Sequence, residues 1–385
     1  MGKKRILVLA STFPRWKNDS TPPFVFELEK RLANNFDIHV LAPHFPGAKK
    51  YEQLDGLKVH RFQYCWPASW QQLCYQGGIL PNLKKNKLLY AQAVCLIFFE
   101  LINAIKIARK EKIDFLHAHW IIPQGIVALL VEKILRIPYI VTAHGSDLHS
   151  LNLILFKKMV LQNAKKITVV SSYLANKIGK INLSFLKKTE IISMGVDLKL
   201  FNPKKYNSSF KKKYNINGPF LLYVGRLTPE KGVEYLIQAM PSVLKKFPQT
   251  KLMIIGGGML KNRLKKQIEK LAIEPNVIFM GSINHNKLGP YFATADIFVS
   301  PSIKEGFGLT ILEAAISGCQ IIGTNIGGVK DIIGKNCLIK PKSPKAISEK
   351  IVQLIKSKKP LKRANMDKFE WGNISKQYYN LFRWL

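Results

Sequence analysis

Residues 305–314 read Glu305-Gly306-Phe307-Gly308-Leu309-Thr310-Ile311-Leu312-Glu313-Ala314, directly after an apolar run typical of a buried strand, Asp296 to Ser300. If a helix begins near Leu309, Glu305 lies on the loop before it and Glu313 lies about one turn inside it. Both carboxylates can then face a ligand at the helix N-terminus, where free backbone N–H groups bind anions and glycines allow close approach. The stretch therefore favours a ligand with both phosphate and hydroxyl groups, such as a sugar nucleotide.

A second cluster of the same kind lies upstream, where Gly225-Arg226-Leu227-Thr228-Pro229-Glu230-Lys231-Gly232 follows another apolar run. Two glycines alone would be explained by a tight turn, with Glu313 as a solvated helix residue. Two such clusters at strand ends, one cationic and one with paired carboxylates, are typical of an anionic-ligand site. Together they resemble the donor site of glycosyltransferase family 4, whose members are retaining enzymes of the GT-B fold.

The resemblance implies a role for each matching residue. Arg226 and Lys231 would stabilise the charge on a departing nucleoside diphosphate, Glu305 would bind hydroxyls of the donor sugar, and Glu313 would bind the ribose. The glycine Gly306 and the backbone N–H groups of Phe307, Gly308 and Leu309 would hold sugar and phosphate. His144, which is followed by Gly-x-Asp, would contact the donor sugar near its anomeric centre, with Asp147 as its companion on the acceptor side or behind it.

The alternation of strand and helix patterns predicts a parallel α/β architecture. We expect two Rossmann-like domains facing across a cleft: residues 1–200 for the acceptor, a polar lysine-rich linker at 201–217, and residues 218–368 for the nucleotide sugar. Residues 369–385 have a helical apolar pattern, and the GT-B resemblance implies that this helix crosses back to the first domain. Gly256-Gly257-Gly258 lacks the spacing of a dinucleotide fingerprint, which counts against a nicotinamide dehydrogenase.

The first domain departs from the family pattern in two places. Family members often have glycines in the loop after the first strand, whereas this chain has Asp19-Ser20-Thr21-Pro22-Pro23 there. Ser20 and Thr21 could donate hydroxyl hydrogen bonds to the acceptor, or could simply cap the next helix. Met194 stands where an asparagine is usual.

Histidines at 117 and 119 end another predicted strand. We expect one to face inward and the other to face a covering helix, both as packed, hydrogen-bonded side chains. No nearby carboxylate or cysteine is expected to make a metal site with them. The chain also has no Asp-x-Asp pair of the kind used by metal-dependent sugar transferases, and we expect neither a metal nor another cofactor.

The chain has 60 lysines and arginines against 24 acidic residues, a net charge of +36. Such a charge favours a polyanionic partner, and with no nucleic-acid-binding motif present we expect an anionic membrane surface and no nucleic acid. The segment from Leu88 to Lys110 is long and apolar but carries a polar stripe. It is either a helix that covers the sheet, the favoured interpretation, or a membrane-surface helix next to Lys84, Lys85 and Lys87.

Five unpaired-looking cysteines and a charged N-terminus that leads straight into a strand favour a cytoplasmic protein, peripheral on the cytoplasmic face of the membrane. We therefore expect a retaining, metal-independent hexosyltransferase that uses a UDP- or GDP-sugar and a lipid-linked or glycan acceptor in cell-surface polysaccharide or glycolipid synthesis. The alternatives are a nucleotide-sugar epimerase of similar fold and a non-catalytic basic protein that binds membrane or nucleic acid.

Overall fold

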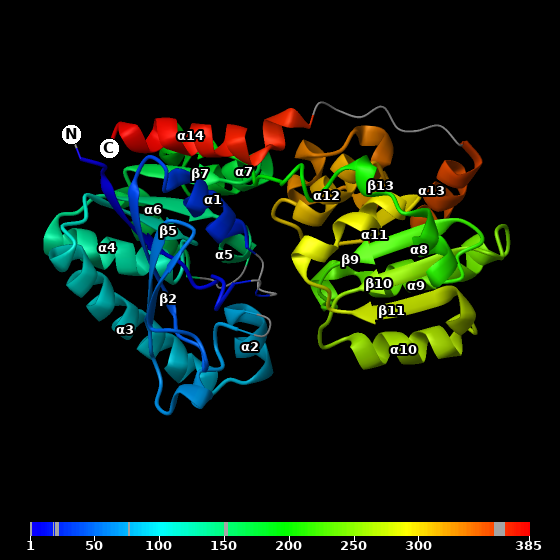
Figure 1. The fold of residues 1–385 in the computed structure, drawn as a ribbon, viewed down its shortest axis with the longest axis horizontal. Coiled ribbons are helices and arrows are strands. Elements are labelled where there is room, and N and C mark those ends of the chain that lie inside the picture. The colour runs from blue at the N-terminus through cyan, green and yellow to red at the C-terminus, as the bar shows by residue number, and fades with distance from the viewer. Residues whose placement is uncertain (1, 18, 20–22, 76–77, 150–152, 358–365) are drawn as a thin grey trace. The chain divides into compact units, whose positions relative to one another are not determined.

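A computed structural model describes residues 2–17, 19, 23–75, 78–149, 153–357 and 366–385 of the chain. The chain forms two compact units, Met1–Gly195 together with Trp371–Leu385, and Val196–Glu370 (Figure 1). Each unit has its own parallel-dominated sheet with helices packed on it, as the predicted pair of Rossmann-like domains requires.

The sheet of the first unit has the strand order β3-β4-β2-β1-β5-β6-β7-β8, and only β3 pairs antiparallel with its neighbour. Its central strands are almost completely buried, because they are apolar runs covered on both faces. The strands are β1 (Arg5–Leu9), β2 (Asp37–Pro43), β3 (Tyr51–Leu54), β4 (Leu57–Phe62), β5 (Phe115–His119), β6 (Tyr139–Ala143), β7 (Lys166–Val169) and β8 (Thr189–Ile191).

The C-terminal helix completes the core of this unit. Trp371, Tyr378 and Phe382 of α14 (Trp371–Arg383) pack with Val25 and Leu28 of α1 (Phe24–Leu32) over the sheet. The predicted return of the C-terminal helix to the first domain is therefore confirmed. The other helices are α2 (Ile79–Lys85), α3 (Leu89–Lys110), α4 (Gln124–Leu135), α5 (Ser146–His149), α6 (Ile154–Asn163) and α7 (Ser172–Ile181).

The second unit has a parallel sheet with the order β11-β10-β9-β12-β13-β14. The chain runs from β9 to β10 on one side, and later returns to place β12 on the other side of β9. This reversal opens a crevice at the carboxyl ends of β9 and β12. The elements are α8 (Ser208–Lys213), β9 (Phe220–Val224), α9 (Val233–Leu244), β10 (Lys251–Ile255), α10 (Lys261–Lys270), β11 (Val277–Gly281), α11 (Gly289–Thr294), β12 (Ile297–Ser300), α12 (Leu309–Ser317), β13 (Gln320–Thr324), β14 (Leu338–Ile339) and α13 (Pro344–Ser357).

Residues 201–217, which we expect to be a linker, lie within the second unit. Phe201 and Phe210 are buried, and the Phe210 ring contacts Phe220 and Tyr291. These two aromatic side chains attach the lysine-rich segment to the second unit. The polar composition of the segment gave no indication of this packing in the sequence.

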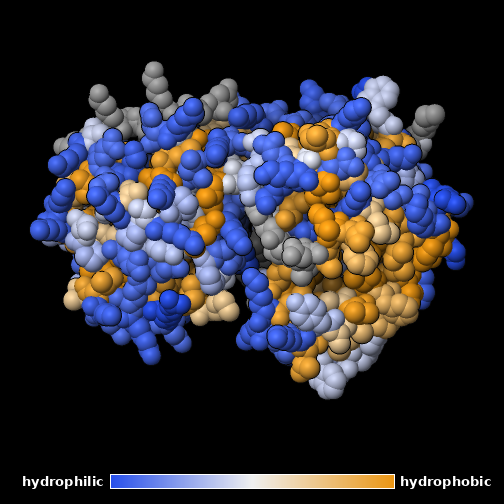
Figure 2. Space-filling view, turned by 180° about the vertical axis from the view of Figure 1, so that it is seen from behind, coloured by the Kyte–Doolittle hydropathy of each residue, from blue (hydrophilic) through white to orange (hydrophobic). Residues whose placement is uncertain are grey.

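The long apolar helix α3 covers the sheet, as favoured from the sequence. It packs against α4 and the strands β1, β2 and β4, and by length and composition alone it would also suffice to cross a membrane. Its outer face leaves Tyr90, Val94 and Phe98 more than half exposed. Hydrophobic side chains also gather broadly over this unit in the space-filling view, on the right of Figure 2.

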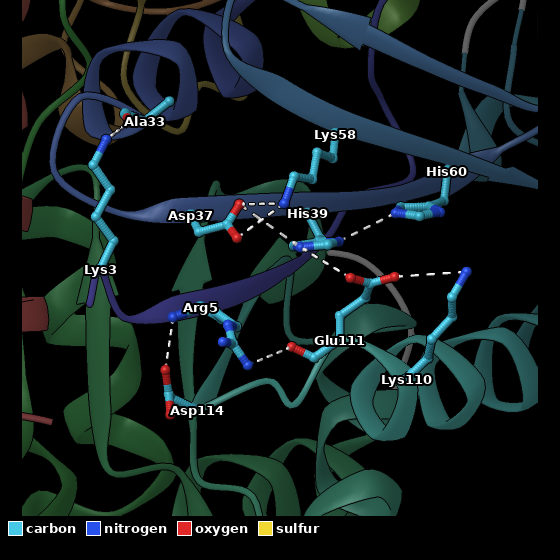
Figure 3. Close-up of polar contacts among 10 residues, drawn as sticks. All are labelled: Lys3, Arg5, Ala33, Asp37, His39, Lys58, His60, Lys110, Glu111 and Asp114. Atoms are coloured by element: carbon cyan, nitrogen blue, oxygen red, sulfur yellow. Dashed lines mark hydrogen bonds and ion pairs between the residues drawn. The ribbon is translucent and has the colours of Figure 1, made fainter. Parts of the chain in front are cut away.

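Two histidines stack beside the first sheet, where α3 ends (Figure 3). The rings of His39 on β2 and His60 on β4 lie 5.5 Å apart with an interplanar angle of 10°, and Lys58 Nζ donates to Asp37 at 2.9 Å. Burial, and then the neighbouring His39, lower the pKa of His60 to about 4. Burial and Lys58 likewise lower the pKa of His39.

We therefore expect the free energy of unfolding to depend on His60 at mildly acidic pH. Between pH 6.5 and about 4, His60 is protonated in the unfolded chain but stays neutral in the folded protein. The free energy of unfolding therefore decreases as the pH is lowered through this range. The slope is at most about 1.4 kcal/mol per pH unit for one such group. Urea unfolding at pH 7.5 and 5 should show a smaller loss for His60→Gln than for the wild type.

The wild type must be compared with His60→Gln because a second buried group, Glu100, makes the free energy of unfolding depend on pH in the opposite direction. Burial between α3 and α4 raises the pKa of Glu100 to about 8, so its contribution to stability decreases as the pH rises from about 4.5 to 8. This contribution is common to both proteins and cancels in the difference. Equal pH dependence in the two proteins would show that the histidine pair has no such effect.

Candidate functional site

In the second unit, the two motifs meet at the crevice between β9 and β12. Lys231 Nζ, from the loop after β9, donates to Glu305 Oε2, from the loop after β12, at 2.6 Å. Their side chains are 20% and 15% exposed, so the pair is partly shielded but can be reached by a ligand. The backbone N–H groups of Ile303 and Lys304 also donate to the Glu230 carbonyl, which fixes the two loops together.

Glycine allows a third loop to enter the same crevice. Gly327 follows β13 with a φ of 51°, and a Cβ on it would lie 1.8 Å from the carbonyl oxygen of Glu305. Gly232 has a similar constraint, because its Cβ would lie 2.3 Å from the carbonyl oxygen of Pro301. Two close backbone contacts, at Pro301 and at Glu305, thus constrain the loop that carries Glu305.

The helix α12 begins at Leu309, as the sequence predicts, after Gly308 in a left-handed conformation with a φ of 104°. Glu313 lies inside the first turns of the helix and its side chain is only 2% exposed. Its Oε1 meets His285 Nε2 at 2.6 Å, whereas its Oε2 is buried without a hydrogen-bond partner among the described residues. An unpartnered buried acceptor oxygen is suited to bind a hydroxyl donor.

Arg226 is the more exposed of the two cations. Its side chain is 49% exposed, and its guanidinium lies 3.3 Å from Glu230. A half-exposed guanidinium is accessible to a phosphate, which it binds through paired N–H donors.

His285, the partner of Glu313, was not predicted from the sequence. It lies on the short 3-10 helix His285–Lys287, between β11 and α11, and its ring packs on Phe201 at 5.1 Å. No motif marks it, since it precedes Glu313 by 28 positions, and only the packing of α11 on α12 brings the two together.

In the first unit, His144 follows β6 and lines a small pocket. The pocket is also lined by His119, Ser193, Met194, Trp371 and Tyr378, so the residue that replaces the usual asparagine faces the same space as His144. Asp147 is buried under this loop, and its two oxygens accept the N–H groups of Gly145 and Ile121, each at 2.9 Å. Asp147 therefore braces the loop behind His144. Ser20 and Thr21 lie outside the described residues.

The expectation for the two histidines of β5 is wrong about the faces they occupy and about the absence of a nearby carboxylate. His117 and His119 face the same side of the sheet, with ring centroids 4.2 Å apart, because residues two apart in a strand share a face. A carboxylate also lies close by. Glu29 of α1 places Oε1 2.9 Å from His117 Nδ1 and 3.1 Å from His119 Nε2.

All three of these side chains are buried, and their ligand atoms lie within 4.8 Å of one another, which is also the spacing of a metal site. Burial alone would raise the pKa of Glu29, but the charge of His117 and hydrogen bonds from both histidines lower it to about 2. Glu29 is therefore ionised and already satisfied at Oε1 by N–H donors. Sequence distance conceals this contact, since Glu29 is 88 positions from His117.

Comparison with known families covers both units. The family model described as "Glycosyltransferase Family 4" matches residues 23–200, and the model described as "Glycosyl transferases group 1" matches residues 205–370. The chain is similar to an uncharacterized glycosyltransferase of Methanocaldococcus jannaschii, with 31% identity over 299 residues, 74% of this chain and 76% of the relative.

Two further relatives have more specific names. A putative teichuronic acid biosynthesis glycosyltransferase of Bacillus subtilis is 30% identical over 62% of this chain and 61% of its own length. The alpha-monoglucosyldiacylglycerol synthase of Streptococcus pneumoniae is 29% identical over 57% of this chain and 54% of its own length.

Solved structures share the fold at low sequence identity. A sucrose-phosphate synthase from Thermosynechococcus elongatus matches with a TM-score of 0.78 at 20% identity, over 99% of this chain and 98% of that one. Anabaena HepE in complex with UDP-glucose matches with a TM-score of 0.75 at 17% identity, over 99% of this chain and 100% of that one.

Proposed function

Because the chain belongs to glycosyltransferase family 4 and is a GT-B glycosyltransferase, we propose that it transfers a hexose-type sugar from a nucleoside diphosphate sugar to an acceptor hydroxyl with retention of configuration. The observation that carries this proposal is the contact of Lys231 with Glu305 at the crevice of the second sheet. It combines a cation for phosphate with a carboxylate for sugar hydroxyls at the place where parallel sheets bind ligands.

The proposed reaction breaks the bond between the anomeric carbon and the phosphate oxygen. Negative charge develops on the departing diphosphate, and fixed cations in a shielded site stabilise it more than the ground state. Lys231 and Arg226 are the proposed cations. The N–H groups of Phe307, Gly308 and Leu309 at the start of α12 would donate hydrogen bonds to the same phosphate. Glu305 orients the sugar hydroxyls once its lysine turns to the phosphate, and the unpartnered Oε2 of Glu313 accepts a ribose hydroxyl.

For retention, the acceptor oxygen attacks the anomeric carbon from the face that the diphosphate leaves. The acceptor proton passes to the leaving phosphate oxygen, so no carboxylate nucleophile is needed. We propose that His144 of the first unit contacts the donor sugar, and Asp147 supports its loop. Of the relatives and neighbours named above, HepE was crystallised with UDP-glucose, which supports a UDP-sugar as the first donor to test.

A thermal-shift screen with UDP-, GDP- and ADP-sugars tests the donor part of the proposal. A ligand that binds the folded protein raises the melting temperature, by an amount that grows with ligand concentration over the dissociation constant. We expect one nucleotide series to stabilise the wild type and to have a much smaller effect on Glu313→Ala. Absence of a shift with every series at millimolar concentration would contradict the site.

Two alternatives are tested with the same donor. An epimerase would convert the nucleotide sugar without any acceptor, and a non-catalytic binding protein would not consume it. The proposed enzyme should release the nucleoside diphosphate rapidly only when acceptor is present, and NMR of the product should show the anomeric configuration of the donor.

We expect activity to survive chelation. The carboxylates beside the proposed cations, Glu305 and Glu230, are each paired with one of them, at 2.6 Å to Lys231 and 3.3 Å to Arg226. In the described part of the chain, the one group of three side chains with metal-ligand spacing is Glu29, His117 and His119 of the first unit. Turnover after dialysis against EDTA should stay within about twofold of the untreated enzyme. Loss of turnover that Mg²⁺ restores would assign a metal to the donor, and restoration by Zn²⁺ alone would point to the histidine group.

We propose further that the acceptor is lipid-linked or is a glycan at a membrane, and that the protein binds the cytoplasmic face of that membrane. The support is an apolar surface beside three exposed lysines. Side chains that are 52–81% exposed form this surface on α3 and the loop before α2: Trp66, Trp70, Leu88, Tyr90, Val94 and Phe98. The loop is attached to α3, since Gln92 Nε2 donates to the Trp70 carbonyl at 2.8 Å and the Trp66 ring contacts Phe99 at 4.9 Å.

Lysines near an anionic leaflet contribute about 1 kcal/mol each, so Lys84, Lys85 and Lys87 suffice to turn this apolar surface toward lipid. In a flotation assay, the protein should rise with vesicles that contain phosphatidylglycerol, and binding should decrease as salt increases. Changing the three lysines to glutamine should lower the bound fraction several-fold.

The matched control changes three exposed lysines of α10, Lys261, Lys265 and Lys266, to glutamine. This variant has the same net charge as the first but keeps the basic cluster beside the apolar surface. Equal loss in the two variants would mean that overall charge alone drives binding. A protein that stays with the soluble fraction at low salt would refute membrane binding and favour a soluble acceptor.

A further inference from the structure

A chain of hydrogen bonds leads from the buried carboxylate of Glu29 to the partly buried ring of His144. Glu29 Oε1 lies 3.1 Å from His119 Nε2, and His119 Nδ1 lies 3.0 Å from His144 Nε2. The ring centroids lie 5.2 Å apart and the ring planes differ by 17°. With the two nitrogens 3.0 Å apart, a centroid separation this long means that the rings meet edge to edge, so the contact lies nearly in the plane of both rings. This is the geometry of an N–H group that points at a ring-nitrogen lone pair.

The order of donors along this chain follows from proton counting. An ionised carboxylate can only accept, so the N–H groups at His119 Nε2 and His117 Nδ1 both point at Glu29. A neutral imidazole has one N–H group. His119 Nδ1 therefore carries a lone pair, and the proton between the two rings belongs to His144 Nε2.

The ionisation states agree with this order. Burial, and then the neighbouring His117, lower the pKa of His119 to about 4, and burial lowers the pKa of His144 well below its usual value. Both rings are therefore neutral near pH 7. Phe24 and Trp120 flank the His144 ring at 5.1 and 4.9 Å, and such apolar neighbours disfavour a second proton.

We propose that Glu29 and His119 are positioning residues that hold His144 as the Nε2–H tautomer, so that its Nδ1 presents a lone pair to the pocket. In the described part of the chain, Nδ1 makes no hydrogen bond, although His144 is only partly buried and lines the pocket. His144 thus accepts a hydrogen bond from a sugar hydroxyl and cannot donate one at this position. This step depends on the proposed sugar site, whereas the tautomer itself does not.

The tautomer can be measured on the full chain without any ligand. In protein with ¹⁵N-labelled histidine, correlations between ring protons and nitrogens distinguish a protonated from an unprotonated ring nitrogen. At pH 7.5 we expect His144 and His119 both to show a protonated Nε2 and an unprotonated Nδ1, with resonances assigned by His144→Gln and His119→Gln. A protonated Nδ1 on His144 would overturn the proposal.

Two substitutions at His119 separate its two contacts. In His119→Asn the amide oxygen takes the place of Nδ1, keeps an acceptor for His144 and loses the contact to Glu29. In His119→Gln the amide nitrogen takes the place of Nε2, keeps a donor for Glu29 and loses the contact to His144. We expect His144 to remain the Nε2–H tautomer in the asparagine variant and to become a mixture of tautomers in the glutamine variant.

Thr142→Val is the control for disturbance of the buried cluster. Its hydroxyl lies 2.7 Å from His117 Nε2 and, among the described residues, makes no hydrogen bond to His119 or His144, so the tautomer of His144 should not change. If the tautomer of His144 is the same in all three variants, Glu29 and His119 do not set it and the proposal fails.

Turnover then tests the link to the sugar site. One lost hydrogen bond corresponds to a decrease of roughly tenfold in kcat/KM for His119→Gln, with the asparagine variant closer to wild type. If the tautomers behave as expected but turnover does not change, the assignment of His144 to the sugar site is wrong, and the tautomer assignment stands. If the donor does not bind the wild type at all, the proposed function fails without affecting the NMR result.

Discussion

Lys231→Ala is expected to lower kcat by about 10²–10³-fold, the usual loss when one group that stabilises developing charge is removed from a shielded site. The lysine lies 2.6 Å from Glu305 and its side chain is 20% exposed, so in the variant water can stabilise the developing negative charge only poorly. The substitution also leaves the carboxylate of Glu305 without its cation, next to a phosphate that carries the same sign of charge. Lys231→Gln should be as damaging, because it keeps the length and polarity of the side chain but not the charge.

Arg226→Ala should cost less, roughly tenfold to a hundredfold, since its side chain is 49% exposed and solvent screens it more. Lys265→Ala on α10 is the matched control, because it removes an exposed lysine from the same unit and should leave kcat unchanged. Thermal melting of each variant checks that the fold is intact. Turnover of Lys231→Ala within threefold of wild type would show that another group carries the leaving-group charge.

Gly327→Ala is expected to abolish donor binding. A Cβ at this position would lie 1.8 Å from the Glu305 carbonyl oxygen, which is backbone and cannot rotate away, and the φ of 51° adds strain for any residue with a side chain. The loop after β12 must therefore move, and Glu305 moves with it. We expect a loss of at least a hundredfold in kcat/KM and about 1–3 kcal/mol in the free energy of unfolding.

Gly334→Ala is the control for this substitution. A Cβ there meets no atom within 4 Å, and its φ of −68° suits any residue. Isothermal titration of both variants with the donor found by thermal shift should show normal affinity for Gly334→Ala and no measurable binding for Gly327→Ala. Normal binding by both would mean that the position of Glu305 is not held by this contact.

The sequence was sufficient to place both motifs at the carboxyl ends of strands in one parallel sheet. Strand ends and glycines placed residues 225–232 and 305–314 at the carboxyl edge of a parallel sheet, and the helix starts at Leu309 as expected. These features are local, since they depend on periodicity, turn chemistry and the rule that ligands bind where parallel strands end. The contact of Lys231 with Glu305 spans 74 positions, and only the order of β9 and β12 in the sheet creates it.

Contacts between elements could not be predicted in the same way. The sequence shows no reason for Glu29 to meet His117 and His119, because this depends on how α1 lies over β5. For the same reason His285 was missed, and Phe201 and Phe210 were hidden in a segment whose lysines indicated a linker. Local patterns identify which face of an element is buried, but the partner on that face is decided by the packing of elements far apart in the chain.

The discontinuous first unit has a consequence for synthesis on the ribosome. Its core needs Trp371, Tyr378 and Phe382, yet all of Val196–Glu370 is translated before them. Domains usually fold in the order in which they leave the ribosome. Here the whole second unit has been synthesised before α14, the helix that packs on α1. Nascent chains that end before α14 must expose Val25 and Leu28 to water, and they are the form of this protein that chaperones should recognise.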